Sequence, residues 1–136
     1  MLVTKIKNKY QIVCNRNDTK YKLAGSTIDG FSVGHNIPNT DSISASLTDY
    51  EILKGVRVIA TSEFSLVSYY AKNDWDRIDQ LVDLISHNKY IDPLIVVEDN
   101  EGLYVLEGGH RLGAIQKLKI KHFPALVVLD LESLDK

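Results

Sequence analysis

The chain has 136 residues, of which 44% are hydrophobic and 25% charged, so we expect one globular domain spanning residues 1–136. Sixteen basic and eighteen acidic residues leave a formal charge of −2, which excludes the broad positive field of proteins that hold nucleic acid without sequence preference. The single cysteine, Cys14, excludes an internal disulfide, and no apolar run approaches membrane-spanning length, so we expect a cytoplasmic protein with no membrane partner.

The N-terminal part shows turn chemistry more than regular structure. Residues 2–23 alternate apolar and polar side chains around the turn NRND, which predicts a β-hairpin extension. Residues 25–48 are rich in Gly, Ser, Asn, Thr and Asp, which predicts a long polar loop. We expect residues 1–55 to be an accessory part of the domain and to offer a surface to a protein partner or to a second copy of the chain.

From residue 56 onward the pattern predicts regular structure. The β-branched run VRVIA (residues 56–60) predicts a strand, and a helix is expected to begin near residue 73 or 74. Aspartates at positions 74 and 76 suit the positive N-terminal end of that helix. Its buried stripe follows the spacing i, i+3, i+4 and i+7 and consists of Ile78, Leu81, Val82 and Ile85.

Two further strands, a second helix and a closing strand follow. The runs LIVVE (94–98) and LYVLE (103–107) flank the turn DNEG, which predicts a hairpin. The second helix is expected over residues 110–118, and ALVVL (125–129) is expected to be the last strand before a polar tail. The order β-α-β-β-α-β, with the N-terminal hairpin as an extension, predicts the α+β class with two main helices.

The turn before the second helix carries groups that can bind an anion or transfer a proton. Glu107 ends the strand, Gly108 and Gly109 make the turn, and His110 and Arg111 begin the helix. The first N–H groups of a helix have no intrahelical partners and carry partial positive charge, so an anion fits there. Arg111 offers a fork of donors and His110 a switchable proton. Spacing alone leaves two interpretations open, a phosphate-binding site and a tight strand-to-helix connection.

Taken together, the segments VRVIA, IDQLVDLISHNKYIDPLIVV, EGGHRLGA and KLKIKHFPALVV resemble the ParB/sulfiredoxin superfamily. The resemblance covers residues 56–130 and implies a compact domain with a small mixed sheet. It also implies that a nucleotide, ATP or CTP with Mg²⁺, binds at Gly108, Gly109, His110 and Arg111. Gly109 stands where sulfiredoxins have their catalytic cysteine, and SLVSYYAKNDW lacks the Pro-Arg pair of partition proteins, so we expect neither of those two activities.

The resemblance implies nucleoside triphosphate binding with hydrolysis or phosphoryl transfer. His110 is then the candidate acid or base, and the carboxylate that takes a hydroxyl proton is one of Glu51, Glu63 and Glu107. A carboxylate beside a phosphate is repelled unless a metal or Arg111 lies between them, which is the reason to expect Mg²⁺. Two alternatives stay open: a DNA-directed nuclease or DNA-binding accessory protein, and a non-enzymatic protein-interaction module whose turn is vestigial.

Two further groups of residues have weaker patterns. Tyr69, Tyr70 and Trp75 cluster at the start of the first helix, where they either stack on a base or pack as part of a core or lid. The four histidines show no spacing typical of a metal site, so the sequence assigns no metal ligands.

Overall fold

The computed structural model describes residues 25–36, 40, 41, 43, 49–69 and 71–134. This part of the chain is a compact α+β fold with two mixed sheets. Its elements in chain order are β1 (Thr27–Ile28), β2 (Phe31–Val33), β3 (Tyr50–Ala60), the 3-10 helix η2 (Thr61–Glu63), α2 (Lys72–Asn88), β4 (Tyr90–Ile91), β5 (Leu94–Asp99), β6 (Gly102–Glu107), α3 (Gly109–Lys117), β7 (His122–Asp130) and α4 (Leu131–Leu134).

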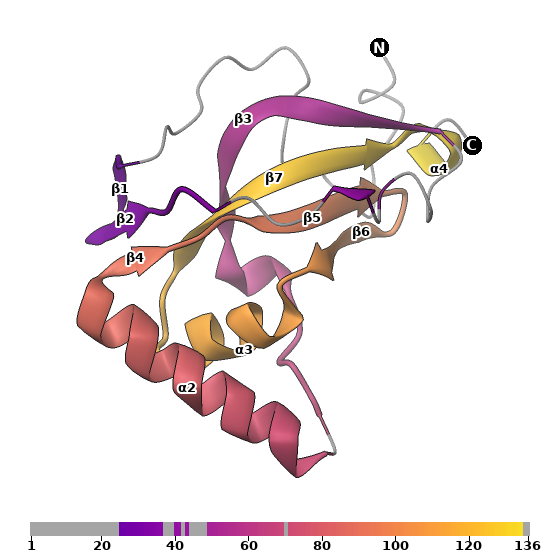
Figure 1. Cartoon of the computed structure of the whole chain (residues 1–136). Coiled ribbons are helices and arrows are strands. Elements are labelled where there is room, and N and C mark those ends of the chain that lie inside the picture. The colour runs from indigo at the N-terminus through magenta and orange to yellow at the C-terminus, as the bar shows by residue number, and fades with distance from the viewer. Residues whose placement is uncertain (1–24, 37–39, 42, 44–48, 70, 135–136) are drawn as a thin grey trace.

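The larger sheet has four strands in the order β3-β7-β5-β6 (Figure 1). β7 runs antiparallel to β3 and parallel to β5, and β5 forms the predicted antiparallel hairpin with β6. All five residues from Leu94 to Glu98 are buried, because β5 lies between two neighbouring strands and apolar side chains cover both of its faces. The apolar run LIVVE is therefore a central strand of the sheet.

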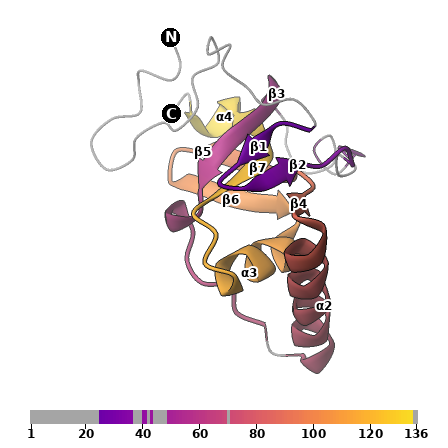
Figure 2. The same ribbon diagram turned by 90° about the vertical axis from the view of Figure 1, so that its left-hand side faces the viewer.

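The helices α2 and α3 pack against each other on the same face of the larger sheet (Figure 1, Figure 2). The predicted stripe of α2 is confirmed, since Ile78, Leu81 and Ile85 are buried and Val82 is partly buried. The helix ends where Lys89 adopts a left-handed conformation with φ of 57° and donates its N–H to the Ile85 carbonyl. The core between this sheet and the two helices includes Ile59, Ile78, Ile85, Leu94, Val96, Leu112, Ile115, Phe123 and Val127.

A second sheet of three short strands has the order β1-β2-β4. β1 and β2 form a hairpin around Asp29 and Gly30, whose φ angles of 51° and 88° are both positive, as a tight two-residue hairpin loop requires. β2 then pairs in parallel with β4. The prediction of a polar loop from residue 25 onward is therefore wrong for β1 and β2, because strands of two or three residues are too short to show an alternating pattern.

Two strands of the larger sheet, β3 and β7, begin before their predicted starts. β3 begins at Tyr50 rather than at residue 56, because its first half continues across a bulge between Ile52 and Val56. β7 begins at His122 rather than at residue 125 and contains Pro124. A proline is tolerated there because pairing with β5 begins only at the next residue, so β7 has a single neighbouring strand at that point.

The end of the chain differs from the predicted polar tail, because residues 131–134 form the short helix α4. Asp130 Oδ1 accepts a hydrogen bond from the Ser133 N–H at 3.2 Å, which is the geometry of an aspartate N-cap. The predicted hairpin of residues 2–23, with Cys14, lies outside the described residues. None of the helices in the described ranges is long and apolar enough to cross a membrane.

Candidate functional site

The predicted turn joins β6 to α3. Gly108 is the N-cap residue with φ of 102°, and the helix begins at Gly109, one residue before its predicted start. The first helical hydrogen bond runs from the Leu112 N–H to the Gly108 carbonyl oxygen at 2.8 Å. The N–H groups of residues 109–111 precede this bond, and Gly108 has no side chain with which to cap them. These amides and the helix dipole make the turn locally positive.

The two glycines of the turn have different physical roles. A Cβ atom at position 108 would lie 2.7 Å from Cγ of the fully buried Leu94, so packing and the positive φ both require glycine. Gly109 has no positive φ, and a Cβ atom there would lie 2.6 Å from the hydroxyl of Tyr69. Gly108 is therefore explained by the tight connection between strand and helix. Gly109 has a different role, because its missing side chain leaves room for the Tyr69 hydroxyl at the start of α3.

The turn forms one wall of a cavity of about 370 Å³. The guanidinium-bearing residues in its lining are Arg77 and Arg111, and the one carboxylate in that lining is Glu107. The lining therefore has a net positive charge even when its histidine is neutral. The complete lining is Tyr69, Arg77, Leu81, Leu106, Glu107, Gly108, Gly109, His110 and Arg111, which includes every residue of the predicted phosphate-binding turn.

Two of the three candidate carboxylates are not part of this cavity. Glu51 lies on β3 opposite Leu129, and Glu63 is an exposed residue of η2. Glu107 is the candidate that the fold places at the turn, at the end of β6 and opposite Ile95.

The imidazole of His110 is held by Asp74, which the sequence pattern assigned to the positive N-terminal end of the first helix. Its Nε2 atom lies 2.9 Å from Oδ1 of Asp74, in the first turn of α2, and both side chains are partly exposed. The ring of Tyr69 stacks on the imidazole with centroids 4.9 Å apart and planes 7° apart. The Tyr69 carbonyl in turn accepts a hydrogen bond from Trp75 Nε1 at 2.8 Å. Asp74 and Tyr69 together fix the plane and the rotamer of His110.

Tyr69 and Trp75, near the start of α2, therefore take a packing role in this structure. Tyr69 packs between the histidine and Trp75, whose ring meets it edge-on at 6.3 Å, while Tyr70 lies outside the described residues. Burial raises the pKa of the Tyr69 phenol above its ordinary value of 10.0, and the nearby Asp74 carboxylate raises it further. The phenol therefore stays neutral over the physiological range and can donate a hydrogen bond.

Arg111 reaches from α3 to the connection between β4 and β5. Its Nη1 atom donates to the Pro93 carbonyl at 3.2 Å and approaches the Asp92 carbonyl at 3.4 Å. Burial lowers the pKa of Arg111, and the Asp92 carboxylate acts in the opposite direction. Arginine is always charged in proteins, so Arg111 carries a positive charge here. It also lines a second, smaller cavity of about 160 Å³ on the side of Tyr90 and Asp92.

Sequence reasoning missed Asp74 and Arg77 as members of this site. Both belong to α2, where an acidic residue at the N-terminal end and an exposed arginine have ordinary explanations in helix stability and solvation. Over the described ranges, no group of three or more His, Cys, Asp or Glu side chains is placed to hold a metal ion. In comparisons with protein-family models and with curated proteins, nothing matches this chain.

Proposed function

We propose that the protein binds a nucleoside triphosphate, ATP or CTP, at the turn of residues 108–111, and that hydrolysis or phosphoryl transfer takes place there. The observation that carries the proposal is the cavity at this turn, which the N-terminus of α3 shares with the guanidinium groups of Arg77 and Arg111. Unbonded helix amides and guanidinium groups are the donors that phosphate oxygens accept from most readily. A cavity of about 370 Å³ is also within the size range of small-molecule sites.

The donors have distinct tasks in the proposed complex. The amides of Gly109 and His110 would hold phosphate oxygens, because no intrahelical acceptor reaches them. Arg111 uses Nη1 for the two backbone carbonyls and keeps its other donors and its charge for the phosphate. Arg77 adds a second cation from α2, so the triphosphate would be held between the two helices.

His110 and Asp74 supply the proton chemistry. A carboxylate only accepts hydrogen bonds, so a neutral imidazole that donates from Nε2 to Asp74 has its lone pair on Nδ1. That atom can take a proton from an attacking water or hydroxyl group. Stacking on Tyr69 keeps the ring from turning away.

The proposal includes Mg²⁺, bound together with the triphosphate. Magnesium is commonly held by one or two carboxylates together with substrate phosphates, and Glu107 is the carboxylate in this cavity. Bound there, the ion would offset the repulsion between Glu107 and a phosphate group.

Membership of the ParB/sulfiredoxin superfamily is part of the same proposal. Its support is the order β3, α2, β5, β6, α3, β7 together with Gly-Gly-His-Arg at the junction of β6 and α3. Sulfinate reduction is not proposed, because position 109 is a glycine whose missing side chain leaves room for Tyr69.

Isothermal titration calorimetry with ATP and CTP, each with and without Mg²⁺, tests the binding step. Arg77→Gln and Arg111→Met should each weaken binding about tenfold or more, because each removes a charge-assisted contact to phosphate. Lys121→Gln is the matched control, since it removes one positive charge outside this cavity. The proposal is wrong if neither nucleotide binds, or if both arginine variants bind as tightly as the wild type.

The chemical step has its own test. His110→Gln and Asp74→Asn should lower the rate of phosphate release about a hundredfold or more while nucleotide affinity changes little, because general acid-base groups act in the transition state. Glu51→Gln and Glu63→Gln are controls, since neither residue lines the cavity. If these controls lose as much rate as His110→Gln and Asp74→Asn, the chemical step does not depend on the pair of His110 and Asp74.

A further inference from the structure

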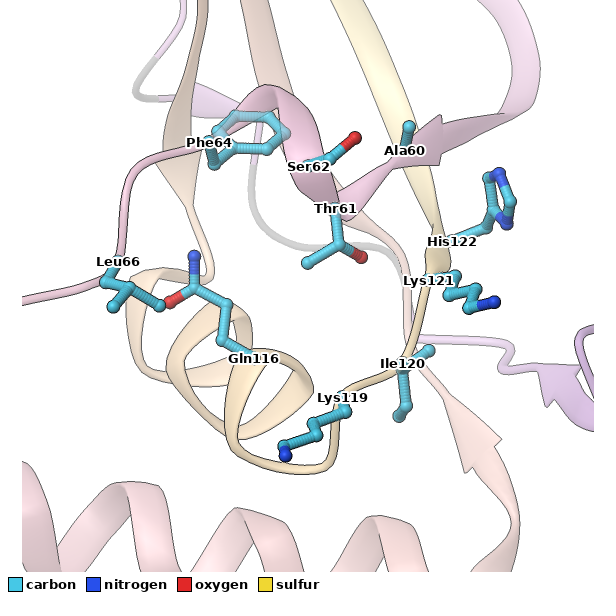
Figure 3. A pocket seen from close by; sticks show the side chains of 10 residues that line it. All are labelled: Ala60, Thr61, Ser62, Phe64, Leu66, Gln116, Lys119, Ile120, Lys121 and His122. Atoms are coloured by element: carbon cyan, nitrogen blue, oxygen red, sulfur yellow. The ribbon is translucent and has the colours of Figure 1, made fainter.

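A larger cavity of about 530 Å³ lies at the other end of α3. Figure 3 shows η2 and the segment that follows it on one side, and the end of α3 with the start of β7 on the other. None of its lining residues belongs to the cavity at the glycine turn. The lining consists of Ala60, Thr61, Ser62, Phe64, Leu66, Gln116, Lys119, Ile120, Lys121 and His122.

The walls of this cavity are mainly apolar. Phe64 packs on the buried ring of Phe123 with centroids 5.7 Å apart, and Ile120 belongs to the main core. Leu66 is 83% exposed, the most exposed large apolar side chain in the described residues. An apolar residue left in solvent at the mouth of an apolar cavity favours a ligand with an apolar body.

Two hydrogen bonds made by Gln116 hold one wall of this cavity in place. The side chain of Gln116 accepts a hydrogen bond from the Val67 N–H at 2.9 Å and donates one to the Ser65 carbonyl at 2.8 Å. These two bonds fix the segment carrying Leu66 to α3. A wall fixed in this way reduces the ordering cost of binding.

The rim of the cavity is positively charged. Lys119 and Lys121 are exposed there, and within the described part of the chain neither makes an ion pair. His122 already has Asp29 as a partner at 2.8 Å, and no Asp or Glu belongs to the lining. Because lysine side chains are long and flexible, both ammonium groups can turn toward an anion at the mouth.

One buried hydroxyl in the lining also lacks a partner. Thr61 extends from η2 toward α3, and among the described residues its Oγ1 atom has no hydrogen-bond partner (Figure 3). A buried polar atom without a partner is unfavourable, and Thr61 Oγ1 is the one such atom in the lining of this cavity among the described residues.

From these observations we propose that the cavity binds an amphipathic monocarboxylate, with its hydrocarbon chain between Phe64, Leu66 and Ile120 and its carboxylate at Lys119 and Lys121. The apolar walls select the chain, and the cationic rim, free of lining carboxylates, selects the negative head. This site is independent of the nucleotide proposal, because the two cavities share no residue.

Calorimetric titration of the full chain with hexanoate, octanoate and decanoate tests the proposal. Affinity should rise about fourfold for each added methylene group, and amide resonances of residues 60–66 and 116–122 should shift in ¹⁵N NMR spectra. Octylamine should bind at least about tenfold more weakly than octanoate, because its charge is repelled by the rim.

Leu66→Asp should weaken octanoate binding about tenfold or more, whereas Leu84→Asp, an equivalent change at a 51% exposed leucine of α2, should leave it unchanged. Both leucines are exposed, so neither change removes a core contact, and circular dichroism checks that each variant is folded. The double variant Lys119→Gln/Lys121→Gln should remove the preference for octanoate over octylamine. The proposal is overturned if no carboxylate binds, if octylamine binds equally well to the wild type, or if Leu66→Asp binds octanoate as tightly as the wild type does.

Discussion

Replacing Gly108 by alanine is the sharpest test of how the turn is built. The added methyl group must be accommodated at φ of 102°, which costs a residue with a side chain about 1–2 kcal/mol. The same methyl would lie 2.7 Å from Cγ of Leu94, a fully buried residue, and overpacking of this kind costs about 1–3 kcal/mol. Reduced freedom of the unfolded chain offsets about 0.4–1 kcal/mol, so we expect a net loss of roughly 1–4.5 kcal/mol.

Gly109→Ala is the matched control for this experiment. Position 109 has no positive φ, and alanine is favoured over glycine in helices by about 1 kcal/mol, while the Tyr69 hydroxyl must shift slightly. We therefore expect its free energy of unfolding to stay within about 1 kcal/mol of the wild type. Urea denaturation followed by far-ultraviolet circular dichroism measures both variants. A loss of less than about 1 kcal/mol in Gly108→Ala, or an equal loss in the two variants, would contradict the steric role assigned to Gly108.

Three further outcomes are expected. Gly113→Ala places a methyl group 2.8 Å from Cδ1 of buried Ile78 and should lower the free energy of unfolding by about 1–3 kcal/mol in urea denaturation. Burial and Asp74 raise the pKa of Tyr69 above 10.0. The neutral phenol therefore contributes stability that is fully present below pH 10.0 and is lost as the pH rises through the raised pKa. Tyr69→Phe has no phenol to ionise, so it should lose less stability than the wild type over this alkaline range. Lys117→Ala breaks an exposed ion pair and should change stability in thermal melts by less than about 1 kcal/mol.

The main elements were predictable because each carries a long periodic signal. The stripe of α2 spans several turns, and LIVVE is apolar at four successive positions because both faces of β5 are covered. Short elements lack such signals, so β1 and β2 were missed. Two local signals were nevertheless present: Asp29-Gly30 is a typical two-residue hairpin loop, and Asp130 three residues before Ser133 is a typical helix cap.

The candidate site was predictable only where its residues are adjacent in the chain. Residues 107–111 line one cavity because a strand-to-helix turn keeps neighbours together. Asp74 and Tyr69 reach His110 from α2 and the segment before it, through helix packing that no local pattern encodes. Asp74, which contacts the histidine, was therefore assigned to the helix dipole. Acids that do not line the cavity, such as Glu51, were considered as the catalytic carboxylate instead.

The packing of α2 on α3 and the pairing of Asp74 with His110 have a common geometric origin. Ile78 follows Asp74 by four residues, and Gly113 follows His110 by three, so each pair lies on one face of its helix. At Gly113 the helices approach so closely that a Cβ atom would meet Ile78 at 2.8 Å, and one turn away the carboxylate and the imidazole are 2.9 Å apart. A methyl group at position 113 must displace Ile78 or move the helices apart, and movement of the helices would lengthen the contact between Asp74 and His110. Close packing at Gly113 is therefore linked to the polar contact one turn away.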